Sequence, residues 1–196
     1  MRSVVAGLIL MLAVGRAVPV RAQGLYHIDQ QFGGIEFTVR NLGLFSSHGA
    51  FDRFVGQLII DPAHPENTRI DVDVDANSVT MPWDEGMTML RSADFFDVGK
   101  YPRIRFTSTA VLELAPNHFR ITGWLRIRGV RQVQVLDAEL VDQHGHTGHG
   151  TDIADFVVSG ELKRSEFGMV SDRGIISDTV RIRIHTRIVL DRAAAG

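Results

Sequence analysis

Alternation of apolar and polar residues is the feature of this chain that most restricts its fold. In residues 70–75, an isoleucine and two valines alternate with three aspartates, and in residues 180–190 branched apolar side chains alternate mainly with arginines. Successive side chains of a β-strand point to opposite faces, whereas a helix repeats every 3.6 residues. Similar alternation recurs at residues 35–39, 103–108 and 119–128. This pattern predicts antiparallel strands with one dry and one wet face.

Other segments complete the predicted sheet. Strands are expected at Phe54–Ile60, Gln132–Val141 and Ile153–Leu162, and a helix is expected between Pro82 and Ser92. The total is about eight strands, with one or two short helical segments. Closure into a barrel would remove the exposed edges, although a two-sheet sandwich satisfies the same alternation. An eight-stranded barrel is just wide enough to be filled by side chains or to hold one small ligand, so a packed core and an apolar tunnel both stay open.

The start of the chain has the features of a secretory signal peptide. Arg2 precedes the apolar run Val4–Val14, and Val20–Ala22 offers short side chains at a cleavage point. The run is shorter than the roughly 20 apolar residues that a membrane span needs. We therefore predict a signal peptide at residues 1–22 and a single domain at residues 23–196. The protein is expected to be periplasmic or secreted, without a permanent membrane anchor.

The charge and the cysteine count exclude several classes of function. Without the predicted leader, 18 Lys and Arg stand against 23 Asp and Glu, a net charge of −5. A nucleic-acid-binding protein would show a basic face, so no nucleic-acid partner is expected. The chain contains no cysteine, which excludes disulfides, thiol catalysis and thiolate metal sites.

A histidine-rich segment, residues 144–150, is a candidate metal site. The imidazole and carboxylate groups in and beside it belong to Asp142, His144, His146, His149 and Asp152. Such groups bind metals, but three glycines in the same segment leave the ligand geometry unfixed. We interpret the segment as a flexible, solvated hairpin loop and predict no metal site.

A second polar group offers the parts of a hydrolytic triad. Ser46, Ser47, His48 and Asp52 supply hydroxyl, imidazole and carboxylate groups. A triad needs fixed mutual geometry, and no nucleophile-elbow pattern surrounds these serines. We predict no catalytic residue and no cofactor.

Four segments in a fixed order resemble the YceI family. They are QFGGIEFTVRNLGLFSSHGAFDRFVGQL, LRSADFFDVGKYPRIRFTS, ITGWLRIRGVRQVQV, and FVVSGELKRSEFGM followed by VRIRI. Together they extend over about residues 24 to 190. The resemblance implies an extended lipocalin-like antiparallel barrel that holds a polyisoprenoid or similar long-chain amphiphilic lipid. It also implies export and a protein that is not an enzyme; a monomer and a homodimer are both left open.

The sequence departs from the family pattern at two places. Asn41 follows Arg40 where the family often has histidine, and Glu85, Gly86, Thr88 and Met89 replace a frequent Arg-Asp-x-His run. The resemblance therefore carries over the apolar part of the site and not the residues that would meet a head group.

The inward-facing apolar residues and the segment around Phe95 and Phe96 are the candidate ligand-binding residues. In the resemblance, the SADFFD segment closes over the barrel, so this pair forms a lid or wall; the alternative is that both plug a packed core. Phe167 and Met169 could likewise either line the cavity or pack in the core. The predicted wall consists of Phe37, Val39, Phe54, Leu58, Leu90, Phe95, Phe96, Ile104, Phe106, Leu125, Phe156, Phe167 and Met169.

Two rival functions come from other classes. One is an enzyme that acts on such a lipid, with His48 as a base at the barrel mouth. The other is a structural or stress-protective barrel whose interior is filled by side chains. A cavity too small for a lipid chain would favour the second.

Overall fold

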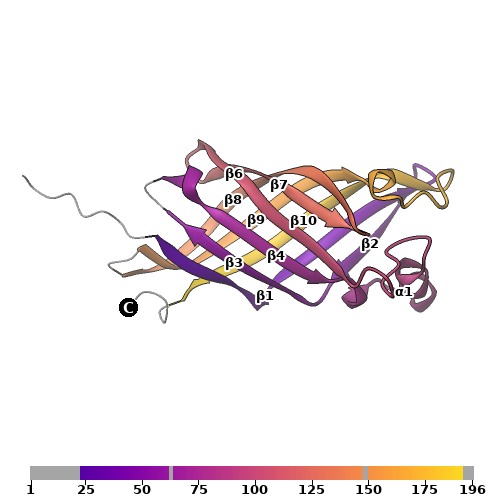
Figure 1. The fold of residues 1–196 in the computed structure, drawn as a ribbon, viewed down its shortest axis with the longest axis horizontal. Helices are drawn as coiled ribbons and strands as arrows, with labels where there is room; N and C mark the ends of the chain where they lie inside the picture. Colours follow the sequence, from indigo (N-terminus) through magenta and orange to yellow (C-terminus); the bar gives the residue numbers. More distant parts are fainter. Residues whose placement is uncertain (1–22, 62–63, 148–149, 192–196) are drawn as a thin grey trace, which may run out of the picture.

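An elongated β-barrel dominates the computed structural model, which describes residues 23–61, 64–147 and 150–191 (Figure 1). Its strands are β1 (Gly24–Asn41), β2 (Phe45–Phe51), β3 (Phe54–Ile60), β4 (Arg69–Asp75), β5 (Val79–Thr80), β6 (Arg103–Ala115), β7 (His118–Ile127), β8 (Val130–Thr147), β9 (Gly150–Lys163) and β10 (Ile176–Leu190). The helical elements are α1 (Asp84–Arg91) and the short 3₁₀ helices η1 (Pro65–Asn67), η2 (Ala76–Ser78) and η3 (Arg164–Phe167).

The strands form one antiparallel sheet that closes because β10 pairs with β1. β2 and β3 pair one after the other with β1, and β5 and β4 pair with β2 and β3 in the same way. β2 and β3 thus lie end to end as one interrupted barrel strand, and β4 and β5 form another. The ten segments therefore make eight strands around the barrel. The predicted eight-stranded antiparallel barrel is confirmed, and the sandwich is excluded.

An irregularity in β1 changes which residues face inward. The pairing with β10 shifts between Asp29 and Gly34, where β1 contains extra residues. Before this bulge Tyr26 and Ile28 face the interior, and after it Ile35 and Phe37 do. A bulge bends a strand and resets its alternation. The even-numbered inward face of the first half therefore becomes odd-numbered in the second half.

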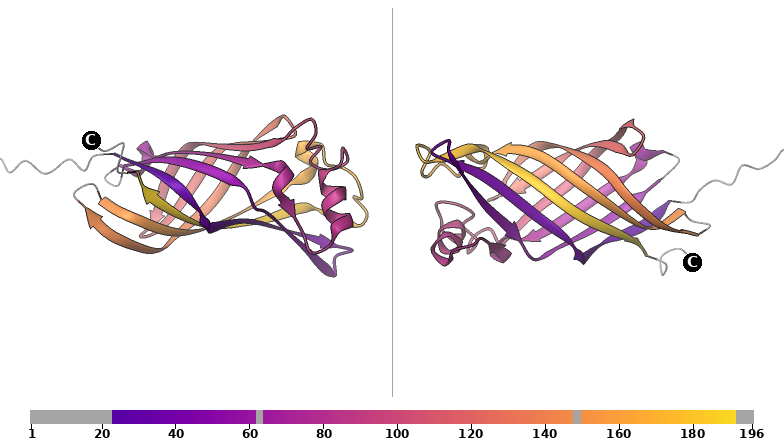
Figure 2. Two further views of the ribbon diagram at one scale, coloured as in Figure 1. Left: turned by 90° about the horizontal axis from the view of Figure 1, so that it is seen from below. Right: turned by 180° about the vertical axis from the view of Figure 1, so that it is seen from behind.

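The two ends of the barrel differ. The helix end carries α1, the turn between β1 and β2, and the segment 164–175 between β9 and β10 (Figure 2). The terminal end carries the start of β1 and the end of β10, which pair through Tyr26 and Leu190. The predicted helix between Pro82 and Ser92 is confirmed as α1. Among the described residues, no helix is long and apolar enough to cross a membrane.

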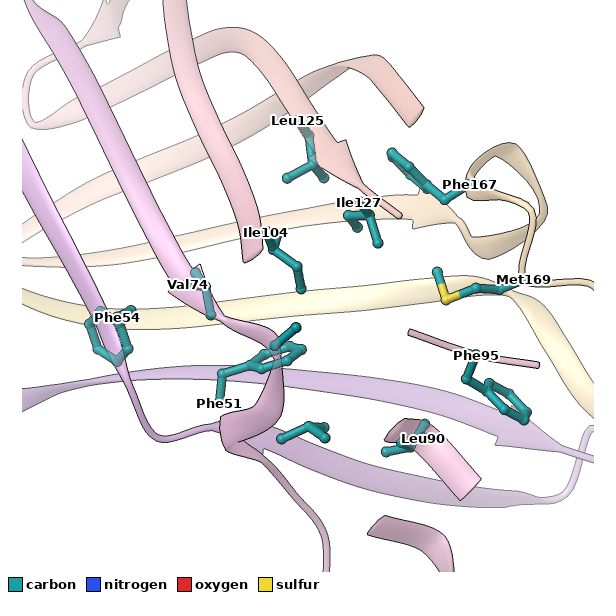
Figure 3. Close-up of a cluster of buried hydrophobic side chains, with 12 residues drawn as sticks. Phe51, Phe54, Val74, Leu90, Phe95, Ile104, Leu125, Ile127, Phe167 and Met169 are labelled. Atoms are coloured by element: carbon teal, nitrogen blue, oxygen red, sulfur yellow. The ribbon is translucent and has the colours of Figure 1, made fainter. Parts of the chain in front are cut away.

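Apolar side chains from the dry strand faces form three buried clusters. The largest lies toward the helix end, where α1 and the segment after it pack against the strands (Figure 3). Its buried members are Phe51, Phe54, Val74, Ala76, Val79, Leu90, Phe95, Ile104, Leu125, Ile127, Phe167 and Met169. Burial of these side chains favours the fold by roughly 25 cal/mol for each Å² of apolar surface removed from water.

The expected loop at residues 144–150 is mostly strand. β8 continues to Thr147 and β9 begins at Gly150, with His144 paired to Ile153 and His146 to Thr151. Backbone pairing satisfies amide groups that a loop would leave to water. The interpretation of the whole segment as a loop was therefore wrong, although the hairpin itself is confirmed. His149 lies outside the described residues.

Candidate functional site: the barrel cavity

The interior of the barrel contains a cavity of about 980 Å³. Side chains from both ends line it: Trp83 and Ile175 at the helix end, and Asp61 and Glu113 at the terminal end. Close-packed protein interiors contain few voids larger than a water molecule. The volume lies near the upper limit of ordinary ligand pockets, roughly 300–1,000 Å³. The barrel therefore encloses a ligand-sized space and is not filled by its own side chains.

The wall of the cavity is largely apolar because each strand turns its dry face inward. β10 contributes Val180, Ile182, Ile184 and Ile188, and every other barrel strand contributes similar residues. Twelve of the thirteen predicted wall residues lie on this wall. They are Phe37, Val39, Phe54, Leu58, Leu90, Phe95, Phe96, Ile104, Phe106, Leu125, Phe156 and Met169. Their contact with a ligand stays a prediction.

Phe167 is the exception. It is 1% exposed and belongs to the large buried cluster, but it is not among the residues that line the cavity. η3 begins immediately after β9 and carries Phe167 at its last residue. Phe167 therefore packs in the core and does not line the cavity. Met169, two residues later, is both buried and on the cavity wall.

Phe95 and Phe96 belong to the packed cluster and to the cavity wall at the same time. The backbone of this segment is held in place, since the amide of Phe96 donates to the carbonyl of Leu90 at 2.9 Å. Arg128 Nη1 also donates to the carbonyl of Phe95 at 2.7 Å. The ring of Phe96 lies 5.4 Å from that of Phe51, edge to face. The pair thus forms a fixed part of the wall near α1.

Several wall residues were not predicted individually. Ile70, Val72 and Val74 lie on the wall, and the alternation in residues 70–75 already indicated their inward face. Phe51 had no such signal, because the segment FSSHGAF of β2 has little apolar alternation. Trp83 and Ile175 come from outside the strands, so periodicity could not have placed them.

Polar groups meet the cavity mainly near its ends. Asp61, Glu113 and Gln143 lie on the wall at the terminal end, and Asn41, Ser47 and Arg164 at the helix end. Other polar groups on the wall belong to Tyr26, Glu36, Thr68, Gln134 and Thr186. Burial raises the pKa of the Tyr26 phenol, with a smaller contribution from the charge of Asp152, so this group stays neutral. Thr186 Oγ1 is buried and has no hydrogen-bond partner within the described part of the chain.

Arg164 is a buried cation on this wall. Its side chain is held by four backbone carbonyls, those of Met169, Ser171, Ile176 and Ser177, at 2.7 to 3.1 Å. Burial lowers the pKa of the guanidinium, and the charge of Asp178 acts in the opposite direction. An arginine keeps its proton under such conditions. Arg164 therefore fixes the segment between β9 and β10 that borders the cavity.

The candidate triad is not assembled. His48 Nδ1 lies 3.0 Å from Thr38 Oγ1, and Asp52 Oδ1 accepts from Thr80 Oγ1 at 3.3 Å. Ser47 lies on the cavity wall, whereas His48 does not. His48 and Ser47 are consecutive strand residues and point to opposite faces. The structure thus gives no support to His48 as a base acting on a ligand inside the barrel.

Two of the candidate metal residues, Asp142 and His144 of β8, form a small cluster with Asp155 of β9, which was not among the candidates. Asp142, His144 and Asp155 bring one ligand atom each within 4.8 Å of one another. His144 Nε2 lies 3.1 Å from Asp142 Oδ2. Both oxygens of Asp155, however, already accept from Arg187 at 2.7 Å. The guanidinium opposes the approach of a cation, so the geometry gives no strong reason to place a metal there.

The comparisons with known proteins agree with this barrel. Residues 26–188 match the family model described as YceI-like domain. The chain belongs to the YceI-like domain family. The Protein YceI of Salmonella arizonae is 32% identical over 177 residues, which is 89% of this chain and 90% of that relative. The predicted resemblance to the YceI family is therefore confirmed.

Solved YceI structures share the fold. The Campylobacter jejuni YCEI protein is 28% identical, with a TM-score of 0.64 over 74% of this chain and 84% of that chain. A polyisoprenoid binding domain from Saccharophagus degradans, implicated in plant cell wall breakdown, is 16% identical, with a TM-score of 0.61 over 85% of this chain and 98% of that chain. At 16% identity the likeness shows a common fold.

Proposed function

We propose that the chain binds a polyisoprenoid or similar long-chain amphiphilic lipid inside the barrel, and carries or stores it without altering it chemically. The observation that carries this proposal is the ligand-sized, largely apolar cavity whose wall reaches from Trp83 and Ile175 at one end to Asp61 and Glu113 at the other. A long apolar chain fits such a space better than a compact polar metabolite. The description of the Saccharophagus degradans domain supports the same ligand class.

The energetics favour an apolar chain. Transfer of each CH₂ group from water to a dry interior is worth roughly 0.8 kcal/mol, so a dozen carbons outweigh a substantial cost of ordering the chain. Polar wall groups lie near the cavity ends, where a head group would remain hydrated. A barrel with a purely structural role has no need of a cavity of about 980 Å³. The rival of a filled, protective barrel therefore loses its main support.

The decisive experiment is mass spectrometry of an organic extract of the purified native protein. We expect a stoichiometric long-chain lipid, and uptake of an added prenyl alcohol by protein that has been stripped of it. Absence of bound lipid, together with failure to take up prenyl alcohols and long-chain fatty acids, would overturn the proposal. Chemical conversion of the bound lipid would instead favour an enzyme.

We also propose that the protein is exported, since β1 begins at Gly24, directly after the predicted leader. N-terminal sequencing of the mature protein is expected to begin near Gln23. A mature chain that keeps Met1 and fractionates with membranes would contradict export.

A further inference from the structure

Large apolar side chains are exposed at the helix end of the barrel, in the turn between β1 and β2 and at the first residue of β2. Leu42 is 64% exposed, Leu44 82% and Phe45 67%. Ile175, on the neighbouring segment before β10, is 54% exposed. We call these four residues the apolar tip. Single exposed apolar residues are ordinary on protein surfaces, whereas a group of them at one place marks an interaction site.

The backbone holds the apolar tip together. The amide of Leu42 donates to the carbonyl of Ile175 at 2.7 Å, and Asn41 pairs with Ile176 across β1 and β10. The amide of Leu44 donates to the carbonyl of Asn41 at 3.0 Å, which closes a tight turn. Leu42 and Gly43 both have positive φ in this turn, and leucine adopts that conformation at a cost. The turn therefore presents its leucines outward in a defined arrangement.

The apolar tip is continuous with the cavity. Ile175 is at once an exposed member of the tip and part of the cavity wall. Trp83, beside α1, is likewise both 43% exposed and part of the cavity wall. Figure 2 shows the β1–β2 turn, the segment before β10 and α1 together at one end of the barrel. An apolar surface thus runs from the outside of the molecule into its interior.

We propose that the apolar tip docks on the surface of a phospholipid bilayer, so that a lipid chain passes between the bilayer and the barrel without crossing water. This inference rests on the proposed lipid-binding function. A long-chain lipid resides in membranes because its transfer to water costs roughly 0.8 kcal/mol for each CH₂ group. A contact that joins the cavity to the bilayer interior removes that barrier, and the tip lies where such a contact would form.

The charges beside the apolar tip determine the kind of attachment. Arg40 and Arg173 flank it, and Asp172 lies next to Arg173. The chain without the predicted leader carries a net charge of −5. These charges give little attraction to anionic lipid, in contrast to membrane proteins with polybasic segments. Docking therefore depends on insertion of Leu44 and Phe45 into the interface, and it persists when salt is raised.

The first test measures co-flotation of the protein with phosphatidylcholine vesicles. The variant Leu44→Asp with Phe45→Asp is expected to bind at least about tenfold less, because two side chains lose their apolar transfer energy. The matched control is Leu112→Asp with Leu114→Asp, which changes two apolar residues that are 53% and 54% exposed on β6. We expect the control to bind vesicles like the native protein.

The second test measures transfer of a fluorescent long-chain fatty acid from these vesicles to the protein. Transfer by contact has a rate that rises with vesicle concentration, whereas transfer through water does not. The native protein and the Leu112→Asp/Leu114→Asp control are expected to show the rising rate. The tip variant is expected to lose it while binding the same amount of fatty acid at equilibrium.

The outcomes separate the two proposals. Protein that binds vesicles through the tip but takes up no lipid would overturn the proposed function and leave the docking surface in place. Native transfer that does not depend on vesicle concentration, or equal vesicle binding by the native protein and the tip variant, would overturn docking. Loss of binding in the control alone would place the contact elsewhere. Leu44→Ala with Phe45→Ala repeats the test should the aspartates disturb folding.

Discussion

Phe37 on β1 and Gly49 on β2 are paired directly across the sheet, and the ring of Phe37 lies over the Cα atom of Gly49. A side chain at residue 49 would overlap three atoms of that ring and would meet no backbone atom as closely. Phe37 also lies on the cavity wall and contacts the ring of Phe51, with 5.6 Å between centroids. The glycine therefore determines where the aromatic ring lies within the cavity.

Gly49→Ala is expected to turn the ring of Phe37 into the cavity and to reduce the amount of long-chain fatty acid bound at saturation. Displacement of a packed ring should cost about 1–3 kcal/mol of stability. Gly34→Ala is the matched control, because a Cβ atom there meets no atom within 4 Å. Fatty-acid titration and urea unfolding measure the two effects. Unchanged fatty-acid binding in Gly49→Ala would show that Phe37 does not border the ligand.

The same enlargement at two phenylalanines should change different observables. Phe106 lies on the cavity wall, whereas Phe167 is fully buried away from it. Phe106→Trp is expected to lower the lipid content with little change in melting temperature, because the larger ring extends into open space. Phe167→Trp is expected to lower stability by about 1–3 kcal/mol through overpacking. Mass spectrometry and thermal unfolding are the measurements, and the opposite pattern would point to a filled barrel.

Arg164→Lys is expected to destabilise the protein by roughly 3 kcal/mol. Four backbone carbonyls accept from the guanidinium, and a lysine cannot supply donors in the same planar arrangement. The control is Arg181→Lys, whose ion pair with Glu161 is exposed and should change stability by less than about 1 kcal/mol. Urea unfolding measures both variants. Equal stability of the two would mean that the carbonyls near Arg164 find water instead.

The ion pair of Asp155 with Arg187 should make part of the stability depend on pH. Hydrogen bonds from Arg187 hold the pKa of Asp155 below its ordinary value of 3.8, and burial partly opposes them. A carboxyl whose pKa falls on folding stabilises the fold fully above its unfolded pKa and loses that contribution as pH falls through the folded pKa. The stability difference between native protein and Asp155→Asn should be constant well above pH 3.8 and should shrink as the pH falls through and below that value. Unfolding at several pH values tests this; a difference that does not shrink as the pH falls below 3.8 would contradict it.

Replacement of His144, His146 and His149 by alanine is expected to leave folding and lipid content unchanged. The contact between His144 and Asp142 is about half exposed on both sides, and even a charged pair with that exposure contributes only about 0–1 kcal/mol. Thermal unfolding, lipid analysis and metal analysis measure the outcome. Stoichiometric zinc or copper in the native protein, lost in this triple variant, would establish a metal site that we do not predict.

The alternation of the sequence determined the strands and their inward faces. β3 begins and ends at the predicted residues, Phe54 and Ile60, and the inward side chains of β4, β7 and β10 follow the period of two. β6 follows it only as far as Phe106, because an irregularity between Ser108 and Ala110 turns Val111 and Glu113 inward instead. The period of two appears because a strand turns successive side chains to opposite faces whatever its neighbours are. Eight of the twelve wall residues lie on strands and could therefore be identified from alternation. Leu90, Phe95, Phe96 and Met169 lie outside the strands, and they were expected from the motifs that resemble the YceI family.

Only the tertiary structure decided whether the inward-facing apolar residues fill the barrel or surround a cavity. The bulge between Asp29 and Gly34 resets the alternation of β1, and residues outside the strands, such as Trp83 and Ile175, complete the wall. A packed cluster and an open cavity require the same apolar residues, so Phe106 and Phe167 look equivalent in the sequence. Which of them borders a space depends on the number and stagger of the strands, which set the radius of the barrel. That radius results from pairings between distant segments, such as β1 with β10, and no local pattern in the sequence contains it.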